Sequence, residues 1–62
     1  MKNLEAADRF AKALHALLNT PTDVLPADEA NIIKNAIWDA AKDADLFYEV
    51  AARLAIAGDL NA

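Results

Sequence analysis

Side chains able to carry out acid–base or nucleophilic chemistry are scarce in this chain. His15 is the single histidine, and the sequence contains neither cysteine nor serine. A histidine can act as a general acid or base near neutral pH, but the two threonines, Thr20 and Thr22, lie in a stretch rich in turn formers rather than beside it. We therefore expect His15 to be an exposed helical residue and the protein to have no enzymatic activity.

Carboxylates suggest a divalent-cation site at two places. Asp39 with Asp43, and Asp45 with Glu49, are four residues apart and would share one face of a helix. Such a cation takes about six oxygen ligands, however, and the spacing typical of a calcium-binding loop is absent. With a single glycine, the chain has no glycine-rich phosphate loop either. We expect no metal and no cofactor.

The one tryptophan is the side chain that most suggests binding. If Ile33 faces the core, Trp38 lies on the opposite face of its helix among polar neighbours, and Tyr48 follows in nearly the same direction. Tryptophan and tyrosine dominate the energetics of protein interfaces, so this face predicts a partner-binding surface. The alternative is that a second copy or a third helix covers it, because tryptophan is buried on average. The expected contact residues are Trp38 and Tyr48, with Lys34, Lys42 and Asp45 at the rim.

The elements that must position these residues are helical. An apolar stripe predicts an amphipathic helix over 4–18, with Asn3 as its N-cap. Pro21 ends this helix, because the residue before a proline is pushed out of the helical region. The stripe consists of Leu4, Ala7, Ala11, Leu14 and Leu18, widened by Phe10 and Leu17.

A connector over 19–26 leads into a second, longer helix. Pro26 marks its start, since proline suits the first turn of a helix, and no proline or glycine interrupts residues 27–57. Apolar residues recur every seven positions through this segment, and Gly58 is a natural stop. The pattern predicts a single helix over 27–57, on the spacing of Ile33, Ala40, Phe47 and Leu54.

Two all-α architectures are open. The second helix would be about 46 Å long and the first only about 22 Å, so half of the long helix has no cover within one chain. In the favoured architecture two helical hairpins pair into a homodimeric bundle, which also suits a 62-residue domain with a marginal core. In the alternative the chain breaks near residues 43–45, where aspartate can cap a third helix that completes a three-helix monomer. The expected core or dimer residues are Phe10, Leu14, Leu17, Ile33, Ile37, Phe47, Val50 and Leu54.

Composition excludes several classes of partner. The net charge is −4 and the six basic residues are spread out, which opposes binding to nucleic acid. No segment reaches the roughly 18 to 20 uninterrupted apolar residues of a membrane span, and no signal-peptide pattern is present. We expect one small, soluble, cytoplasmic domain over 1–62.

Two short patches resemble the Rop family of small plasmid RNA-binding regulators. Residues 25–29, LPADE, resemble the connector of that family, and Arg9-Phe10 falls where the family has an aromatic residue on its RNA-binding helix. The resemblance implies two-helix chains that pair into a four-helix bundle and bind RNA. The sequence departs from the family at Ala6 and Leu14, where polar RNA contacts belong, and at Pro21, where the helix would continue.

Absence of chemistry, an acidic surface and a tryptophan among polar residues together favour a binding role. We expect a small regulator or inhibitor that binds a larger bacterial or phage protein. One alternative is an acidic mimic of nucleic acid that blocks a DNA- or RNA-binding protein, and another is a Rop-like RNA-binding regulator.

Overall fold

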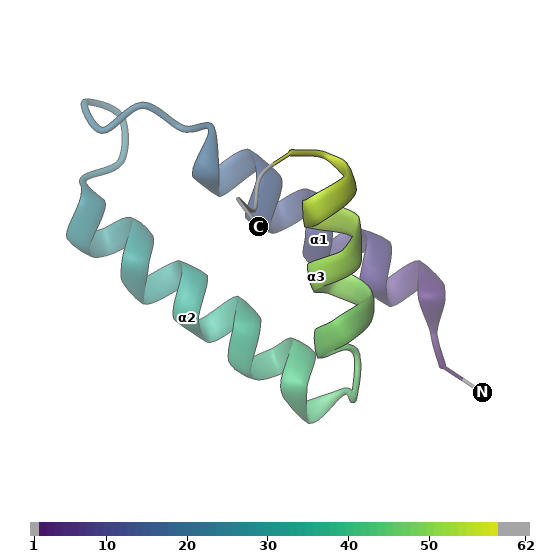
Figure 1. Cartoon of the computed structure of the whole chain (residues 1–62). Helices are drawn as coiled ribbons and strands as arrows, with labels where there is room; N and C mark the ends of the chain where they lie inside the picture. The colour runs from purple at the N-terminus through teal and green to yellow at the C-terminus, as the bar shows by residue number, and fades with distance from the viewer. Residues whose placement is uncertain (1, 59–62) are drawn as a thin grey trace.

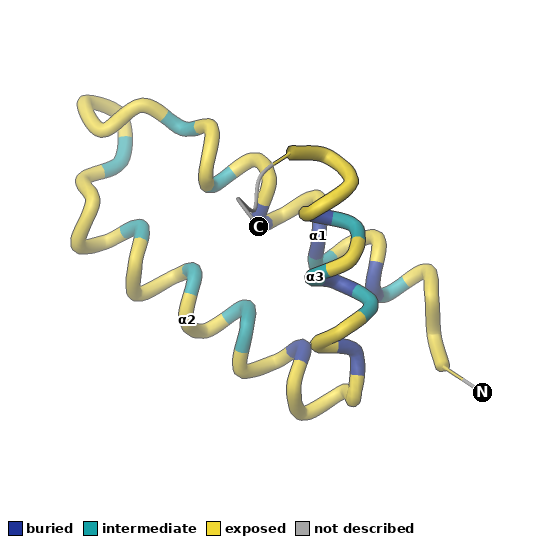
Figure 2. The backbone as a smooth tube through the Cα atoms, viewed as in Figure 1, coloured by how far each residue is buried: buried dark blue, intermediate teal, exposed yellow. Residues whose placement is uncertain are grey.

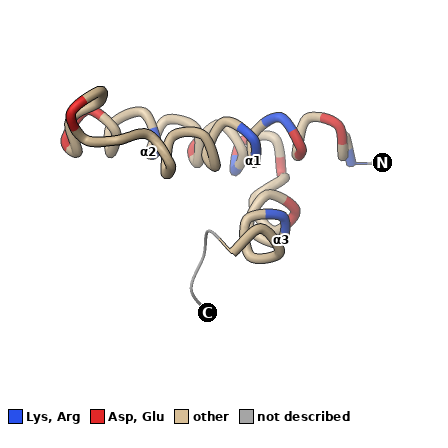
Figure 3. The backbone as a smooth tube through the Cα atoms, turned by 90° about the horizontal axis from the view of Figure 1, so that it is seen from above, with Lys and Arg blue, Asp and Glu red and all other residues tan. Residues whose placement is uncertain are grey.

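The computed structural model describes residues 2–58, which form three α-helices and no strand. They are α1 (Leu4–Leu18), α2 (Ala27–Asp43) and α3 (Phe47–Ile56). Helices α1 and α2 form an antiparallel hairpin, and α3 turns back across α1 (Figure 1). Seen from above, α1 and α2 share one layer and α3 lies on one side of it (Figure 3). The chain thus has the three-helix arrangement that was the alternative expectation.

Local signals at both ends of α1 explain its bounds, which are those expected. The Asn3 side chain caps the helix by accepting a hydrogen bond from the Ala6 amide at 3.1 Å. At the other end the Asn19 amide donates to the His15 carbonyl at 2.7 Å, and the Thr20 hydroxyl donates to the Ala16 carbonyl at 2.7 Å. These side chains add hydrogen bonds to carbonyls near the helix end, where the His15 carbonyl also accepts from the Asn19 backbone amide at 3.1 Å.

The prediction of one continuous helix over 27–57 is wrong, because the chain breaks after Asp43. Asp45 has a positive φ of 58°. The Leu46 amide donates to the Ala41 carbonyl at 2.8 Å, and the Asp45 amide donates to the Lys42 carbonyl at 3.0 Å. These two bonds with one left-handed residue define a Schellman motif, the usual glycine position being taken by aspartate. Asp45 therefore ends α2 and does not cap α3, whose N-cap is Leu46 without a side-chain hydrogen bond.

The break is favoured by the burial of Leu46. Its side chain is 1% exposed and Ala41 is fully buried, the apolar pair that commonly accompanies a Schellman motif. A straight helix would carry α3 away from α1, whereas the turn lets α3 pack mainly on α1 and less on α2. Small side chains at Ala7 and Ala11, both buried, allow the two helices to approach closely.

Burial is concentrated where α3 crosses α1 and at the turn between α2 and α3 (Figure 2). The buried residues among those described are Ala7, Ala11, Leu14, Ala41, Leu46, Val50 and Leu54. Toward the connector, both α1 and α2 extend beyond α3 and are mostly exposed. The core is thus small and lies at one end of the hairpin.

The expected core residues divide into three groups. Leu14, Val50 and Leu54 are buried, and Phe10, Leu17 and Ile37 are half-buried. Ile33 and Phe47, by contrast, are exposed at 42% and 37%. The expected buried face of α2 was derived from a seven-residue spacing that ran through one continuous helix. Because the helix breaks at residues 44–46, α2 buries a different face. The inward residues of α2 are accordingly Lys34, Ile37, Trp38 and Ala41, while Ala36 and Ala40 are exposed.

Within residues 2–58, none of the three helices is both long enough and apolar enough to cross a bilayer.

Candidate protein-binding surface

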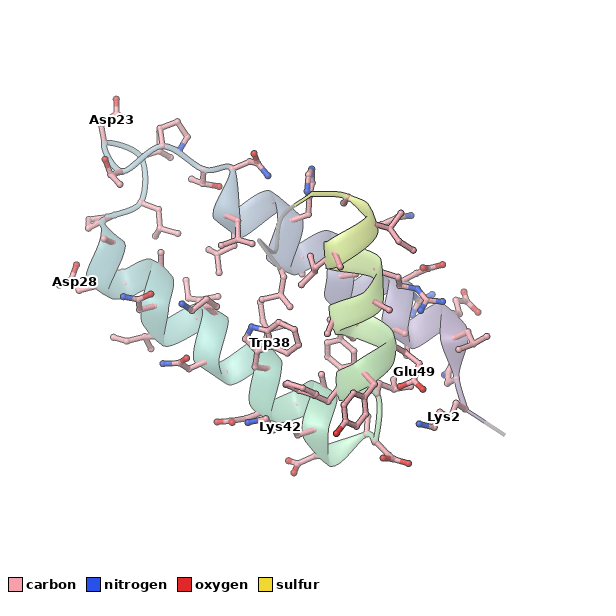
Figure 4. The ribbon with its side chains drawn as sticks, viewed as in Figure 1. Lys2, Asp23, Asp28, Trp38, Lys42 and Glu49 are labelled. Carbon is pink, nitrogen blue, oxygen red and sulfur yellow. The ribbon has the colours of Figure 1, made fainter. Side chains whose placement is uncertain are left out.

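Trp38 lies on the inward face of α2, not on the opposite face as the sequence analysis expected. Its side chain is half-buried and packs against the core. The indole ring points toward α3 (Figure 4), where its centroid lies 5.1 Å from that of Phe47 with the planes tilted by 49°. Trp38 therefore belongs partly to the core, and Phe47 of α3 covers part of its ring.

Phe47 joins Trp38 to Tyr48. The Phe47 and Tyr48 rings meet edge to face, with centroids 5.6 Å apart and an interplanar angle of 85°. Such tilted and edge-on arrangements are the favoured geometries for aromatic pairs. Tyr48 is 79% exposed, so the three rings run from the core out to the surface. We call Trp38, Phe47 and Tyr48 the aromatic cluster.

The aromatic cluster borders a shallow groove between α2 and α3 with a volume of about 610 Å³. Aromatic and apolar surface is supplied by Trp38, Phe47 and Ala51, and polar groups by Asn35, Asp39 and Lys42. The Lys42 ammonium lies 5.4 Å from the centre of the Phe47 ring, within the range of a cation–π contact. We call this hollow the aromatic groove.

The predicted contact residues are only partly brought together. Trp38 and Lys42 line the aromatic groove and Tyr48 adjoins it through Phe47. Lys34 is half-buried one turn earlier on the inward face of α2. Asp45 lies in the turn before α3, 92% exposed at its side chain, with a carboxylate oxygen 3.9 Å from the Lys2 ammonium.

Phe47 is the surface residue that the sequence analysis assigned to the core. A signal was nevertheless present, because consecutive helical residues point about 100° apart. Phe47 and Tyr48 are adjacent, so when Tyr48 faces solvent, Phe47 lies about 100° around the helix, near the edge of the buried face. Once α3 is a separate helix, Val50 and Leu54 occupy its buried stripe and Phe47 stands at the stripe's margin.

A second, smaller groove of about 330 Å³ separates α1 from the end of α3. It is lined by Asp8, Ala11, Lys12, His15, Arg53, Leu54 and Ala57. Within this lining the Arg53 guanidinium donates to the Asp8 carboxylate at 2.6 Å, an ion pair between α3 and α1. Its lining has no aromatic ring other than that of His15, so it lacks the large rings that commonly anchor a protein interface.

An ion pair between Lys2 and Glu49 ties the chain before α1 to α3 (Figure 4). The Lys2 ammonium donates to Glu49 Oε1 at 2.8 Å, and the Glu49 side chain is only 21% exposed. This hydrogen bond is the main cause that lowers the pKa of Glu49, and the same bond raises the pKa of Lys2. The other oxygen, Glu49 Oε2, is buried without a hydrogen-bond partner among the described residues.

Carboxylates and imidazoles within residues 2–58 do not gather in groups of three or more that could hold a metal ion. Comparison of the chain with protein-family models, with curated proteins and with solved structures found no match. The geometry of the described residues is therefore what supports a function.

Proposed function

We propose that the chain is a protein-binding module that docks on a partner protein through the aromatic cluster. The observation that carries this proposal is the exposure of Tyr48 and Phe47, at 79% and 37%, next to a half-buried tryptophan. Contiguous exposed aromatic surface is unusual on a small protein unless it contacts something, and tryptophan and tyrosine are the commonest anchors of interfaces.

The ring contacts prepare this surface for binding. Phe47 is held between Trp38 on one side and Tyr48 on the other, so a partner does not need to order these side chains on docking. Less entropy is then lost in forming the complex. Asn35, Asp39 and Lys42 along the aromatic groove supply the polar rim that an interface also needs.

In this proposal the protein is not an enzyme and acts by occupying a surface of a larger protein as its regulator or inhibitor. A chain with one histidine and no cysteine or serine has few groups for catalysis, whereas its aromatic groove is suited to contact. Blocking a partner's surface requires affinity and shape alone.

We also propose that the chain forms a homodimer. Several large apolar side chains of the hairpin remain exposed beyond the reach of α3: Leu18 at 48%, Val24 at 71%, Ile32 at 70% and Ile33 at 42%. Burial of such side chains against a second copy would offset the small size of the core.

Tyr48→Ala is the sharpest test of partner binding, because Tyr48 contributes little to the core. Tagged wild type, Tyr48→Ala and the control Ile56→Ala would be used to capture proteins from a nuclease-treated bacterial lysate. Ile56 is an apolar residue of the same helix, 88% exposed and outside the aromatic groove. A protein retained by wild type and Ile56→Ala but lost by Tyr48→Ala is the expected result. Equal retention by all three would refute docking on the aromatic cluster.

A direct titration completes the test. The single tryptophan lines the aromatic groove, so its fluorescence reports the environment of the proposed interface. Adding the captured protein should shift the emission of Trp38 in wild type and in Ile56→Ala, since docking removes water from the groove. An unchanged emission at saturating partner would place the contact elsewhere.

A further inference from the structure

The connection between α2 and α3 is short and holds a residue in an unfavourable backbone conformation, two features of hinges that allow a helix to swing away from its own chain. It consists of three residues, Ala44, Asp45 and Leu46, and holds the only non-glycine residue with positive φ among those described, Asp45 at 58°. Short hinges that keep the backbone in an unfavourable conformation favour exchange of the element beyond them between copies. The hinge contains neither glycine nor proline, so it can also extend as helix.

The contacts of α3 would survive such an exchange. Helix α3 rests mainly on α1 and only lightly on α2. Among the described residues, α3 forms ion pairs through Arg53 with Asp8 and through Glu49 with Lys2, and both partners lie in or just before α1. A second copy presents the same α1 surface, with the same buried alanines at Ala7 and Ala11.

From these features we propose that two copies of the chain exchange α3, so that α3 of each copy packs on α1 of the other. The hinge opens, Asp45 leaves the left-handed region, and the two hairpins are brought side by side. The aromatic cluster is rebuilt from Trp38 of one copy and Phe47 of the other. This inference rests on the proposed homodimer and gives it a defined structure, and it is independent of whether the aromatic cluster binds a partner.

Ion pairs give the exchange a direct test. Heavy-isotope and normal copies are unfolded, mixed in equal amounts and refolded together at high concentration, and the dimer and monomer fractions are separated by size. A carbodiimide then joins the Lys2 ammonium to the Glu49 carboxylate, 2.8 Å apart, as an amide with loss of water. Trypsin releases the product as peptide 1–9 linked to peptide 43–53, whose mass shows whether the two parts come from one copy or two.

In the dimer fraction we expect about half of this linked peptide to carry one heavy and one normal part, the statistical share for contacts made between copies. The monomer fraction is the control, in which both parts must carry the same label. A dimer fraction that yields no mixed peptide would overturn the exchange and indicate two closed copies meeting face to face. Absence of any dimer fraction after refolding at high concentration would overturn it as well.

Hinge variants provide a second, independent measurement. Asp45→Gly removes the penalty for a positive φ and should lower the dimer fraction several-fold. The matched variant Asp45→Ala keeps that penalty, lengthens the helix-forming run and should raise the fraction. Both changes remove the same exposed carboxylate, so they differ only in the backbone. Equal dimer fractions for the two variants would contradict the assignment of Ala44, Asp45 and Leu46 as the hinge.

Discussion

At the scale of single residues, Trp38 and Tyr48 belong to one aromatic cluster but contribute differently to the folded chain. Trp38 packs on the core through its ring face toward α3, while most of the Tyr48 side chain lies in solvent. Removal of a side chain costs stability in proportion to the contacts and apolar area that the fold gives it. Binding and folding can therefore be separated within the cluster, with Tyr48 as the residue to change.

The first prediction concerns the free energy of unfolding of two variants. Tyr48→Ala should change it by no more than about 0.5 kcal/mol, as is usual for exposed positions. Trp38→Ala should lower it by about 2 kcal/mol, less than the cost for a fully buried tryptophan because the ring is half-buried. Urea unfolding followed by circular dichroism measures both, since Trp38→Ala removes the fluorophore. Equal losses would mean that Tyr48 also carries part of the core.

The second prediction is a pH dependence that comes from Glu49. Its pKa in the folded chain lies below the ordinary value of 4.5 because the Lys2 ammonium donates to it. The unfolded chain therefore takes up the proton first as the pH falls. The stabilisation is fully present above pH 4.5 and is lost as the pH falls through the lowered pKa. On the alkaline side, the stabilisation that Lys2 contributes is fully present below its ordinary pKa of 10.5. It is lost as the pH rises through the raised pKa of the folded chain.

Urea midpoints at neutral pH and near pH 3 measure this contribution, the lower value being chosen because carboxylates titrate around there. The fall in midpoint should be smaller in Glu49→Gln than in wild type. Glu5→Gln is the matched control, because Glu5 pairs with Arg9 on the exposed side of α1 and both side chains are 79% exposed. A fall of wild-type size in Glu49→Gln would assign the acid sensitivity to other carboxylates.

At the scale of the elements, the turn that ends α2 determines the fold. A left-handed aspartate is tolerated better than most residues but less well than glycine. Asp45→Gly should therefore raise the free energy of unfolding of the monomer by about 1 kcal/mol, and Asp45→Ala should lower it by a similar amount. Thermal unfolding at low protein concentration measures the monomer. A loss of stability in Asp45→Gly would indicate that the Asp45 side chain contributes more than its backbone conformation costs.

The helix ends that local signals define were predicted directly, whereas the break near residues 43–45 was predicted only as the alternative to a continuous helix. The Asn3 cap, the stop before Pro21 and the start after Pro26 depend on side chains within a few residues of each helix end. The break depends instead on a tertiary gain, the burial of Leu46 beside Ala41 when α3 reaches α1. Aspartate at the left-handed position gave no glycine signal to mark it.

The same error displaced part of the candidate site. Because the face of α2 was aligned with Phe47 through an unbroken helix, Trp38 was placed outward and Phe47 inward. In the structure Trp38 is half-buried on the inward face of α2 and Phe47 is 37% exposed, which is opposite to both expectations. Tyr48 and Lys42 are exposed as expected, because both lie off the buried stripe of their helix in either phase.

At the scale of the whole molecule, a small core is placed at one end of an elongated fold. The principal extents are 40, 22 and 19 Å, and the largest fully buried side chains are Leu14, Leu46, Leu54 and Val50. The part of the hairpin beyond α3 keeps apolar residues such as Ile32 and Ile33 exposed. An element that covers only part of a hairpin leaves surface for a second copy, which is why the proposed homodimer and the three-helix fold are compatible.

The distribution of charge separates the two ways in which this molecule would contact a protein. Its net charge is −4, but lysine and arginine are interspersed with aspartate and glutamate along the helices (Figure 3). Asp8 and Glu49 already pair with Arg53 and Lys2. A mimic of nucleic acid needs a surface of one sign, which attracts its target over a distance and is weakened by salt. The aromatic groove, by contrast, carries both an aspartate and a lysine beside its rings.

Affinity for the captured partner should therefore depend weakly on salt. Between about 0.05 and 0.5 M salt, where screening lengths shrink from beyond 10 Å to a few ångströms, we expect the dissociation constant measured by Trp38 fluorescence to change by less than about three-fold. Burial of aromatic surface is not screened, so Tyr48→Ala should weaken binding at both salt concentrations by the same factor. A loss of affinity of about ten-fold or more with added salt, unaffected by Tyr48→Ala, would instead favour acidic mimicry, because it would place the binding energy on the carboxylates.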